Sequence, residues 1–482
     1  MEIAGSVISL DHYIGGERVS SPSVFQVHSP LKWEEVLAEM SAGDHEISDL
    51  AVTSASDAFQ DWASLSPQER ASFLYRLADL IDREVSNIAR VECTDMAMRH
   101  ESLFNRVIPR GARNFRAYAD LASAYEGRTW ESNGTTNLIQ RLPAGPTVVI
   151  TPWNAPFMLA TWKIAPALAA GNTVILKPAE WAPLSSSILA DLVDEAGFPP
   201  GVFNVVQGIG GEVGSFLTKD PRVRRISFTG STETARKIGI EAAKNVVPFT
   251  AELGGKGALV VLEDADVEQA AATAAGQYDD SGQVCLAATR LIVSDKISEH
   301  FLECFHQNVD GHILGDSFDD ETTITPLIHP DHLQRVESFI DRALENGDEI
   351  IRGGRRLNDQ QLFYEPTLVK PASNNSEIVQ REVFGPVLTF QTFQDEQEAV
   401  KLANSTEYGL SATLFTGSKE KAEIIGSALR AGTVWVNCFL VRDLTAPFGG
   451  LGISGLGREG GDYALDFHSD LKTLQIKKAD ES

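Results

Sequence analysis

An α/β fold built from two successive doubly wound domains is predicted by three features of this 482-residue chain. The chain is about three times as long as an ordinary domain, so more than one core is expected. Apolar strands alternate with helical patterns from residue 146 to 252, which favours right-handed crossovers and a largely parallel sheet. The alternation begins again at Gly257. Ligands usually bind where two such domains meet, so the junction near residue 252 is the expected site.

The N-terminal region predicts a hairpin followed by two long helices. Gly15 and Gly16 are typical of a tight turn between short strands. Helical spacing of apolar residues runs from Pro67 to Met98, with a Ser cap before the proline. A second helix is expected over residues 102–124. Pro109 should break or kink it and give the following Arg110 side chain its own direction.

Two polar segments predict β-structure at the surface. Residues 126–141 contain Gly and Asn with weak alternation, as in a projecting hairpin, and residues 470–478 form an alternating C-terminal strand. Both are interpreted as exposed β edges. Because unpaired edges promote aggregation, a second subunit is expected to cover them. The sequence does not choose between a homodimer and a homotetramer.

Composition excludes several classes of partner. The net charge of −26 makes nucleic acid and anionic membrane surfaces poor partners. The four cysteines are scattered and show no metal-ligand spacing, so no metal site is predicted and a reducing compartment is indicated. No basic, apolar leader and no apolar window of about 18 residues occurs, which favours a soluble, cytoplasmic protein.

The segment from Glu252 to Cys285 holds a carboxylate and a thiol, each framed by small residues. Most cysteines are small core residues, and most Glu side chains are solvated. Here, however, Glu252 ends an apolar strand directly before two glycines, and Cys285 follows SGQV. Such turns allow backbone N–H groups to approach a reacting atom. Both residues are therefore candidates for catalysis.

Seven motifs in order along the chain resemble those of the aldehyde dehydrogenase superfamily. They are TPWN (151–154), KPAE (177–180), FTGS (228–231), ELGGK (252–256), GQVC (282–285), EVFGP (382–386) and PFGGLGISGLGREGG (447–461). The resemblance spans nearly the whole chain and implies two Rossmann-like α/β domains plus a small β oligomerisation element. It assigns residues 1–125 and 142–251 to an NAD-binding domain, 252–462 to a catalytic domain, and 126–141 and 463–482 to the oligomerisation element.

The resemblance also implies a reaction, the oxidation of an aldehyde to a carboxylic acid with NAD. A thiolate attacks the carbonyl, hydride leaves to the nicotinamide, and a base activates water to hydrolyse the thioester. Cys285 would be the nucleophile and Glu252 the general base. The Asn154 amide and the backbone N–H of Cys285 would form the oxyanion hole. Glu459 matches a position implicated in proton relay, although a surface Glu in a Gly-rich loop is an equal alternative.

The expected cofactor site does not follow the regular dinucleotide fingerprint. In GIGGEVG (208–214) the last glycine falls one place late for GxGxxG. In the family the pyrophosphate instead lies at the N-terminus of the helix after FTGS. A carboxylate at residue 180 accepts hydrogen bonds from ribose hydroxyls and repels a 2′-phosphate, so NAD is favoured over NADP. The residues expected at the cofactor are Thr151, Trp153, Lys177, Glu180, Gly210, Gly230, Ser231, Leu253, Glu382 and Phe384.

The substrate pocket is expected to be apolar with two exceptions. Leu159, Trp162, Val284, Leu286 and Phe448 match positions that line the substrate tunnel in relatives. Arg442 and Arg110, in VRDL and IPR, are similar to the arginines that clamp the substrate carboxylate in 2-hydroxymuconate and 2-aminomuconate semialdehyde dehydrogenases. The alternative is that both are structural ion pairs, with Asp443 as one partner. Asp280, close to the thiol, is expected to raise its pKa.

Other functions remain open alternatives. A CoA-acylating dehydrogenase is disfavoured by Glu252, because such relatives usually lack this acid. A phosphorylating or NADP-linked enzyme is disfavoured by Glu180. A broad-specificity aldehyde dehydrogenase and a non-catalytic binding protein on the same fold are the remaining readings.

Overall fold

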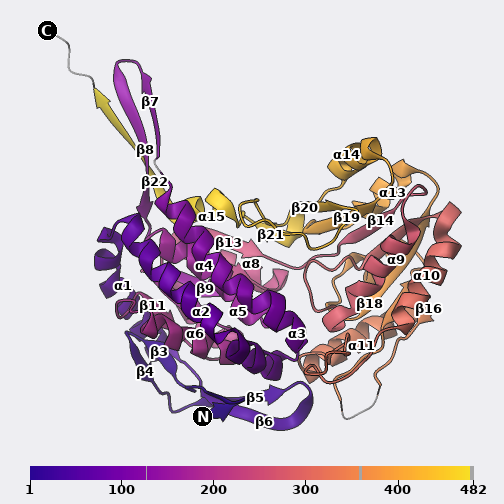
Figure 1. Ribbon diagram of the computed structural model, residues 1–482, viewed down its shortest axis with the longest axis horizontal. Helices are drawn as coiled ribbons and strands as arrows, with labels where there is room; N and C mark the ends of the chain where they lie inside the picture. Colours follow the sequence, from indigo (N-terminus) through magenta and orange to yellow (C-terminus); the bar gives the residue numbers. More distant parts are fainter. Residues whose placement is uncertain (126, 358–360, 478–482) are drawn as a thin grey trace.

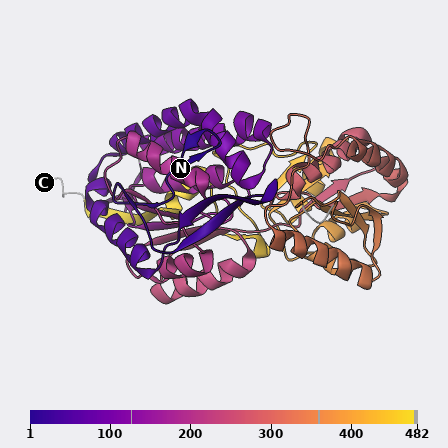
Figure 2. The ribbon, with the colours of Figure 1, turned by 90° about the horizontal axis from the view of Figure 1, so that it is seen from below.

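The computed structural model describes residues 1–125, 127–357 and 361–477, and two lobes and a projecting arm make up its shape (Figure 1). Each lobe contains one large sheet with helices on its faces, and Figure 2 shows the helices above and below the sheet of the first lobe. The predicted α/β architecture is confirmed. No helix among the described residues is both long and apolar enough to cross a membrane.

The first lobe contains an eight-stranded sheet in the order β21-β13-β12-β9-β10-β11-β3-β4. Its five central strands are parallel, and their apolar residues other than Phe249 are buried, as expected for strands covered by helices on both faces. The strands are β3 (His12–Ile14), β4 (Glu17–Val19), β9 (Thr147–Ile150), β10 (Val174–Lys177), β11 (Phe203–Val205), β12 (Arg225–Thr229), β13 (Phe249–Glu252) and β21 (Gly455–Leu456).

Register aligns the carboxyl ends of these parallel strands. Lys177 pairs with Ile150, and Thr229 pairs with Glu252. The loops that follow the four strands therefore lie along one edge of the sheet, and they carry the motifs TPWN, KPAE, FTGS and ELGGK. The helices α5 (Pro156–Ala169), α6 (Leu184–Glu195) and α8 (Thr232–Asn245) follow the first three of these loops, and α7 (Ser215–Lys219) follows β11.

The second lobe contains a seven-stranded sheet in the order β16-β17-β18-β15-β14-β19-β20. All of its pairs except β16 with β17 are parallel. Its strands are β14 (Ala258–Val261), β15 (Arg290–Ser294), β16 (Glu349–Arg352), β17 (Thr367–Lys370), β18 (Val387–Phe393), β19 (Ser411–Phe415) and β20 (Thr433–Val436). Its helices are α9 (Val267–Ala275), α10 (Ser298–Asp310), α11 (Pro330–Glu345), α12 (Glu377–Gln380), α13 (Glu396–Ala403) and α14 (Lys419–Ala428).

The two sheets present opposite strand ends to the junction. In the second sheet the motif-bearing loops 253–257, 282–289 and 382–386 precede β14, β15 and β18, so they lie at amino ends. β21 falls within residues 252–462 yet pairs with β13, so this part of the chain contributes to both large sheets. A site between the lobes therefore combines carboxyl-end loops of one sheet with amino-end loops of the other.

The arm is a three-stranded sheet of β7 (Arg128–Ser132), β8 (Thr135–Pro143) and β22 (Ser469–Lys477). Each of the two predicted segments provides an edge strand, and β22 also pairs with β8 along its whole length, which the sequence did not predict. The edges of the arm are β7 and β22. Residue 126 and residues 478–482 of the predicted segments lie outside the described residues. The short helix α15 (Gly461–Phe467) leads directly into β22.

The N-terminal helices follow the sequence pattern closely. α1 (His45–Ser64) precedes α2 (Pro67–Met96), where Ser66 and Glu69 form a capping box. Pro109 lies in the first turn of α4 (Ile108–Ser123), immediately after α3 (His100–Ser102) and a turn of π-helix over Leu103–Val107. The helix irregularity expected at Pro109 is therefore a π turn that ends at Val107, just before the proline. The remaining strands form two hairpins: β1 (Glu2–Ile3) with β2 (Ser6–Val7), and β5 (Val24–Ser29) with β6 (Lys32–Ser41).

Candidate active site

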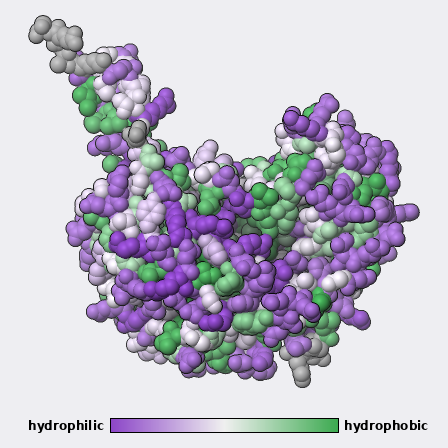
Figure 3. Space-filling view, in the orientation of Figure 1, coloured by the Kyte–Doolittle hydropathy of each residue, from purple (hydrophilic) through white to green (hydrophobic). Residues whose placement is uncertain are grey.

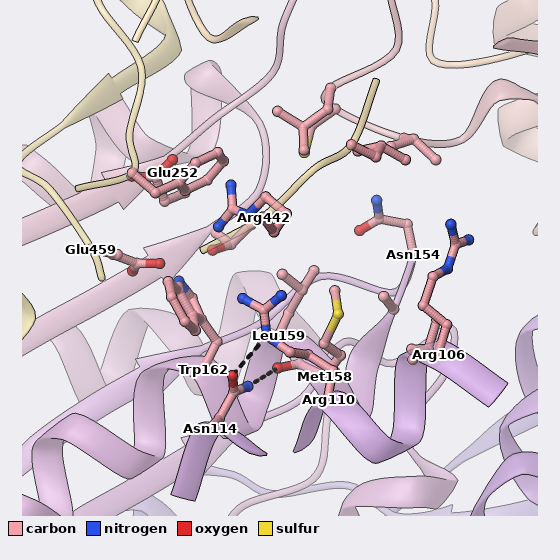
Figure 4. A pocket seen from close by; sticks show the side chains of 18 of the residues that line it. Arg106, Arg110, Asn114, Asn154, Met158, Leu159, Trp162, Glu252, Arg442 and Glu459 are labelled. Atoms are coloured by element: carbon pink, nitrogen blue, oxygen red, sulfur yellow. Dashed lines mark hydrogen bonds between the residues drawn. The ribbon is translucent and has the colours of Figure 1, made fainter. Parts of the chain in front are cut away.

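A cavity of about 860 Å³ opens where the two lobes meet. The space-filling view shows the hollow between the lobes (Figure 3), and the close view shows the side chains that line the cavity (Figure 4). All seven residues expected to bind substrate line it, together with the four candidate catalytic residues. The full set of predicted residues in its wall is Arg110, Asn154, Leu159, Trp162, Glu252, Leu253, Val284, Cys285, Leu286, Arg442, Phe448 and Glu459.

The Cys285 thiol lies on a loop that is held very close to the ELGGK motif. A Cβ atom on Gly255 would overlap the carbonyl oxygen of Cys285, so only glycine fits there. The surroundings of the thiol are apolar and carry carboxylates. Burial first, and then Glu382 and Glu252, raise the pKa of Cys285 to about 12, while the Arg442 guanidinium opposes the shift. The resting thiol is therefore protonated at neutral pH.

The Asn154 side chain enters the same cavity from the start of α5. It is 8 % exposed, and its Nδ2 donates to the backbone oxygen of Gln283 at 3.0 Å. An amide nitrogen carries two hydrogens, so one remains for a ligand. Gln283 is itself fixed, because its Oε1 accepts from the N–H of Ile328 at 3.0 Å. These contacts fix the position of the amide relative to the loop that carries the thiol.

Glu252 and Glu459 lie together on the other side of the cavity in Figure 4. Glu459 is buried and forms an ion pair with Lys163 of α5, so it is not a surface residue. Lys163 also donates to Ser227 Oγ and to the backbone oxygen of Phe228, each at 3.2 Å. Sequence reasoning missed Lys163, which lies on an otherwise apolar helix.

Glu252 has no hydrogen bond to its Oε2 from any described residue. Burial, and then the carboxylate of Glu459, raise the pKa of Glu252 well above its usual value, and Lys163 opposes this shift. A carboxyl group in such surroundings takes up a proton readily. The Glu252 carboxyl therefore keeps its proton to higher pH than an ordinary Glu does, with the Glu459 carboxylate in the same wall of the cavity.

Lys177 and Glu180 form a pair on the loop after β10, with 2.9 Å between Nζ and Oε2. Burial alone would raise the pKa of Glu180, but Lys177 and backbone N–H groups hold it below its usual value. The carboxylate is therefore charged and accepts hydrogen bonds. A Cβ on Gly210 would lie 3.5 Å from both Glu180 Oε2 and Lys177 Nζ, so Gly210 borders this pair.

The loop after β12 leads into the N-terminus of α8. Ser231 caps this 14-residue helix by accepting from the N–H of Thr234 at 3.2 Å. Ser231 is exposed and Gly230 is half-buried, so the first turn of α8 is open to a ligand. Thr151 lies beside this edge at the end of β9, is buried, and donates its backbone N–H to Lys177 at 3.2 Å. A helix N-terminus of this kind suits a phosphate.

The last group of predicted cofactor residues lies between the lobes. Glu382 Oε1 accepts from the N–H of Gly255 at 2.8 Å, and burial raises the pKa of this carboxyl to about 7. A Cβ on Gly254 would overlap the same carboxylate. The ring of Trp153 lies perpendicular to that of Phe384, with centroids 5.3 Å apart. These residues, from both lobes, thus face one another.

Arg110 and Arg442 enter the cavity without carboxylate partners among the described residues. Arg110 donates from Nε to Asn114 Oδ1 at 3.0 Å, and the guanidinium of Arg442 lies 3.7 Å from the ring centre of Phe448. Asp443 does not pair with Arg442, because its Oδ1 accepts from the backbone and hydroxyl of Thr445. Burial, and then Arg442, lower the pKa of Arg110 to about 10.

Several cavity residues were not predicted from the sequence. Asn114 is one helical turn beyond Arg110 on α4, and this spacing was the available signal. The unpredicted lining residues include Met98, Arg106, Arg113, Asn114 and Met158.

Asp280 does not act on Cys285 as expected; it accepts from the backbone N–H and the Nε of Arg99 at 3.0 and 3.3 Å. In the described part of the chain no cluster of His, Cys, Asp or Glu is suited to a metal ion.

Loops suited to a dinucleotide on one sheet and a half-buried thiol on the other meet around one cavity, an arrangement that suits an oxidoreductase with a dinucleotide cofactor. The sequence matches the description "Aldehyde dehydrogenase family" over residues 18–474. The chain belongs to this family.

Known proteins similar to this chain cover nearly its full length. The 2-hydroxymuconic semialdehyde dehydrogenase of Pseudomonas sp. (strain CF600) is 37 % identical, over 97 % of this chain and 99 % of the relative. The 2-aminomuconic semialdehyde dehydrogenase of Danio rerio is 36 % identical, over 97 % and 98 %. Betaine aldehyde dehydrogenase from Staphylococcus aureus, solved in complex with NAD⁺, is 35 % identical, with a TM-score of 0.95 over 98 % and 95 % of the two chains.

Proposed function

We propose that this enzyme oxidises a semialdehyde that carries a carboxylate, such as 2-hydroxymuconate or 2-aminomuconate semialdehyde, to the corresponding acid with NAD. The observation that carries the proposal is the pair of guanidinium groups, Arg110 and Arg442, which enter the cavity without a described carboxylate partner. An unpaired buried cation is costly, and an anionic substrate offsets that cost. The names of the two semialdehyde dehydrogenase relatives favour the same class of substrate.

The residues of the proposed NAD site fit the cofactor on both sides of the junction. Ser231 and Gly230, at the N-terminus of α8, would hold the pyrophosphate, and the charged Glu180, paired with Lys177, would accept from the adenosine ribose. Glu382 and the Phe384 ring would hold the nicotinamide ribose and ring. Gly210, Thr151, Trp153 and Leu253 would complete the channel. When bound, NAD accepts the hydride that leaves the substrate carbon.

Cys285 would supply the nucleophile. Its thiol first releases its proton to solvent. The thiolate sulfur then bonds to the carbonyl carbon, and the oxyanion that forms accepts hydrogen bonds from the free Nδ2 hydrogen of Asn154 and the backbone N–H of Cys285. Loss of hydride restores the carbonyl and leaves a thioester on Cys285. The positive Arg442 opposes part of the rise in the pKa of the thiol and so favours the thiolate.

Glu252 would then activate water. It takes a proton from the water that attacks the thioester, the carbon–sulfur bond breaks, and the product leaves as a carboxylic acid. The proton on Glu252 can pass toward Glu459 and its partner Lys163. Glu252 favours water over CoA as the acceptor because it places a base where the thioester is hydrolysed.

The apolar walls would position the chain of the substrate between thiol and arginines. Leu159, Trp162 and Phe448 line the cavity, and Val284 and Leu286 flank the thiol in sequence. A carboxylate held between Arg110 and Arg442 can accept bidentate hydrogen bonds from either guanidinium.

The test is a comparison of aldehydes matched in length, with and without a terminal carboxylate, monitored by NADH absorbance. Arg442→Ala should lower kcat/KM for the carboxylated aldehydes by about 10- to 100-fold, with little change for neutral ones. Arg116→Ala is the control, since Arg116 lies on α4 but pairs with Asp79 and Asp82. Equal losses on both substrate types would instead indicate a broad-specificity aldehyde dehydrogenase.

The proposal includes a division of the chain into domains, with boundaries at residues 125, 142, 252 and 462. It also includes a role for the arm in assembly. Apolar side chains on β22 are exposed in the single chain, including Leu471, Leu474 and Ile476. Exposed edges with apolar side chains are usually covered by a partner. We infer that the arm contributes to a homodimer or homotetramer.

A further inference from the structure

Two helices that follow site loops begin without caps of their own. The N-cap of α5 is Ala155 and that of α6 is Pro183, and neither makes a side-chain cap hydrogen bond. Both helix starts are buried. The first N–H groups of a helix have no partner within the helix, so buried ones need an acceptor from elsewhere.

One turn of α2 supplies both acceptors. Glu92 Oε2 accepts from the N–H of Phe157 at 3.0 Å, and Asp95 Oδ2 accepts from the N–H of Leu184 at 2.8 Å. Both carboxyl groups have 0 % exposure. Because they are three residues apart, they lie on one face of α2 and connect two different helices to the same turn.

Each of the capped helices begins just after a group in the proposed machinery. Only Ala155 separates Asn154 from the first residue of α5. Three residues, Trp181, Ala182 and Pro183, separate Glu180 from the first residue of α6. The directions of these helix starts therefore fix the Asn154 amide and the Glu180 carboxylate. A shift of about 1 Å in such groups costs up to about 100-fold in rate.

The two carboxyl groups are too poorly paired to be explained by stability alone. Glu92 Oε1 and Asp95 Oδ1 receive no hydrogen bond of ordinary geometry from a described residue, and neither group forms an ion pair with one. Burial raises the pKa of Glu92 to about 7, and the Ser185 hydroxyl, which lies close to this carboxyl, opposes the shift. Buried acids without cationic partners are costly, so the presence of two such groups on one turn points to a benefit other than packing.

We propose that Glu92 and Asp95 are positioning residues with separate tasks. Glu92 holds the start of α5 and thereby the oxyanion donor Asn154, while Asp95 holds the start of α6 and thereby the ribose acceptor Glu180. The inference rests on the roles proposed above for Asn154 and Glu180. One helical turn of α2 thus sets the distance between the carbonyl-binding and cofactor-binding loops.

The experiment separates the two tasks by measuring kcat at saturating aldehyde and NAD, and NAD binding by quenching of tryptophan fluorescence. Glu92→Ala should lower kcat about tenfold or more and leave the Kd for NAD within about twofold. Asp95→Ala should raise the Kd for NAD about tenfold and leave kcat at saturation nearly unchanged. Glu92→Gln and Asp95→Asn keep an acceptor oxygen and should restore most of each loss.

Thr94→Ala is the matched control. Thr94 lies between the two acids, and its hydroxyl donates to the backbone oxygen of Arg90 at 2.9 Å rather than to α5 or α6. It should change neither constant. Asn154→Ala and Glu180→Ala are measured beside them as references, with kcat and NAD affinity respectively as their expected losses.

The outcomes are decisive in either direction. Parallel changes of kcat and NAD affinity in both alanine variants, or no recovery in Glu92→Gln and Asp95→Asn, would overturn the inference. If the alanine variants do not fold, Glu92→Gln and Asp95→Asn are compared with each other. Glu92→Gln should then show a small loss of kcat and Asp95→Asn a small rise in the Kd for NAD, and the absence of this difference counts against the inference. Failure of Asn154→Ala to lower kcat would reject the proposed oxyanion role and with it the task of Glu92. Losses in Asn154→Ala and Glu180→Ala beside unchanged constants in Glu92→Ala and Asp95→Ala would reject the positioning role alone.

Discussion

Arg110 and Arg442 lie over the same indole ring, that of Trp162, with their guanidinium carbons 5.0 and 5.8 Å from its centre. They come from α4 and from the loop before PFGG, far apart in the sequence. The ring attracts each cation, while the two cations repel each other; burial first, and then Arg442, lower the pKa of Arg110. An anion between them would relieve that repulsion.

Arg110→Lys should show whether geometry or charge matters at this pair. Lysine keeps a positive charge but loses the planar fork that binds a carboxylate through two hydrogen bonds. We expect KM for a carboxylated semialdehyde to rise about tenfold with kcat little changed. Arg116→Lys, on the same helix, should leave both constants as they are. Steady-state kinetics with an unaltered KM for Arg110→Lys would reject the bidentate contact.

Glu252→Gln should separate the two halves of the reaction. Glutamine keeps the shape but cannot take a proton from water, so hydrolysis of the thioester should become limiting. We expect a rapid burst of about one NADH per Cys285, followed by turnover slowed at least about 100-fold. Stopped-flow absorbance measures both phases. Glu263→Gln is the control, because Glu263 pairs with Lys296 at the exposed surface. A time course of Glu252→Gln that is slow from the start, without a burst, would show that Glu252 acts before hydride transfer.

The hydrolysis step should also depend on pH. Since burial and Glu459 raise the pKa of Glu252, its protonated form persists to higher pH than in an ordinary Glu. Deacylation therefore rises as pH increases through the raised pKa and is lost below it. The pH profile of steady-state turnover in wild type, when deacylation is limiting, checks the sign. A rate that is flat from pH 5 to pH 9, roughly, would contradict it.

Alkylation of Cys285 should reveal its raised pKa in the protein without NAD. With a pKa of about 12, the thiolate fraction grows roughly tenfold for each pH unit across the accessible range, without a plateau. Arg442→Ala removes a cation that lowers this pKa, so alkylation at any one pH should slow further. Iodoacetamide labelling followed by mass spectrometry measures the rate, with Cys285→Ser as the blank. A plateau near neutral pH would contradict the assignment.

Lys163→Met should damage stability and chemistry together. It leaves the Glu459 carboxylate buried without its ionic partner, which costs about 3–5 kcal/mol of unfolding free energy. Lys163 also opposes the upward shift of the Glu252 pKa, so its loss should move the pH profile of hydrolysis upward. Urea unfolding and turnover are measured against Lys237→Met, an exposed pair on α8. Matching stabilities in the two variants would argue against the buried ion pair.

Substitutions on the arm should change the assembly state. Leu474→Asp and Ile476→Asp place charges on the exposed apolar side chains of one face of β22, and burying them against a second subunit becomes costly. We expect light scattering to show a species of lower mass than wild type. Thr473→Asp, on the opposite face of the strand, tests whether that face is also covered. Unchanged mass for the Leu474 and Ile476 variants would remove the arm from the interface.

Much of the fold and site could be predicted because their signals are local. Strand–helix alternation, the capping box at Ser66 and the glycines around Cys285 depend on neighbours in the sequence. The resemblance added residue positions, and all seven predicted substrate residues line one cavity. The sequence predicted less well which strands and side chains pair with one another. The pairing of β22 with β8 and that of Asp280 with Arg99 depend on contacts between distant segments, which no local pattern specifies.

The sequence by itself determined the family and hence the kind of chemistry to expect, because seven motifs occur in order along the chain and resemble those of aldehyde dehydrogenases. Only the tertiary structure decided how the side chains of the site are tuned. Glu459 is buried against Lys163, Arg110 shares Trp162 with Arg442, and Glu92 and Asp95 hold two helix starts from one turn of α2. Burial and long-range neighbours set the charge and position of a side chain, and both arise only when distant segments pack.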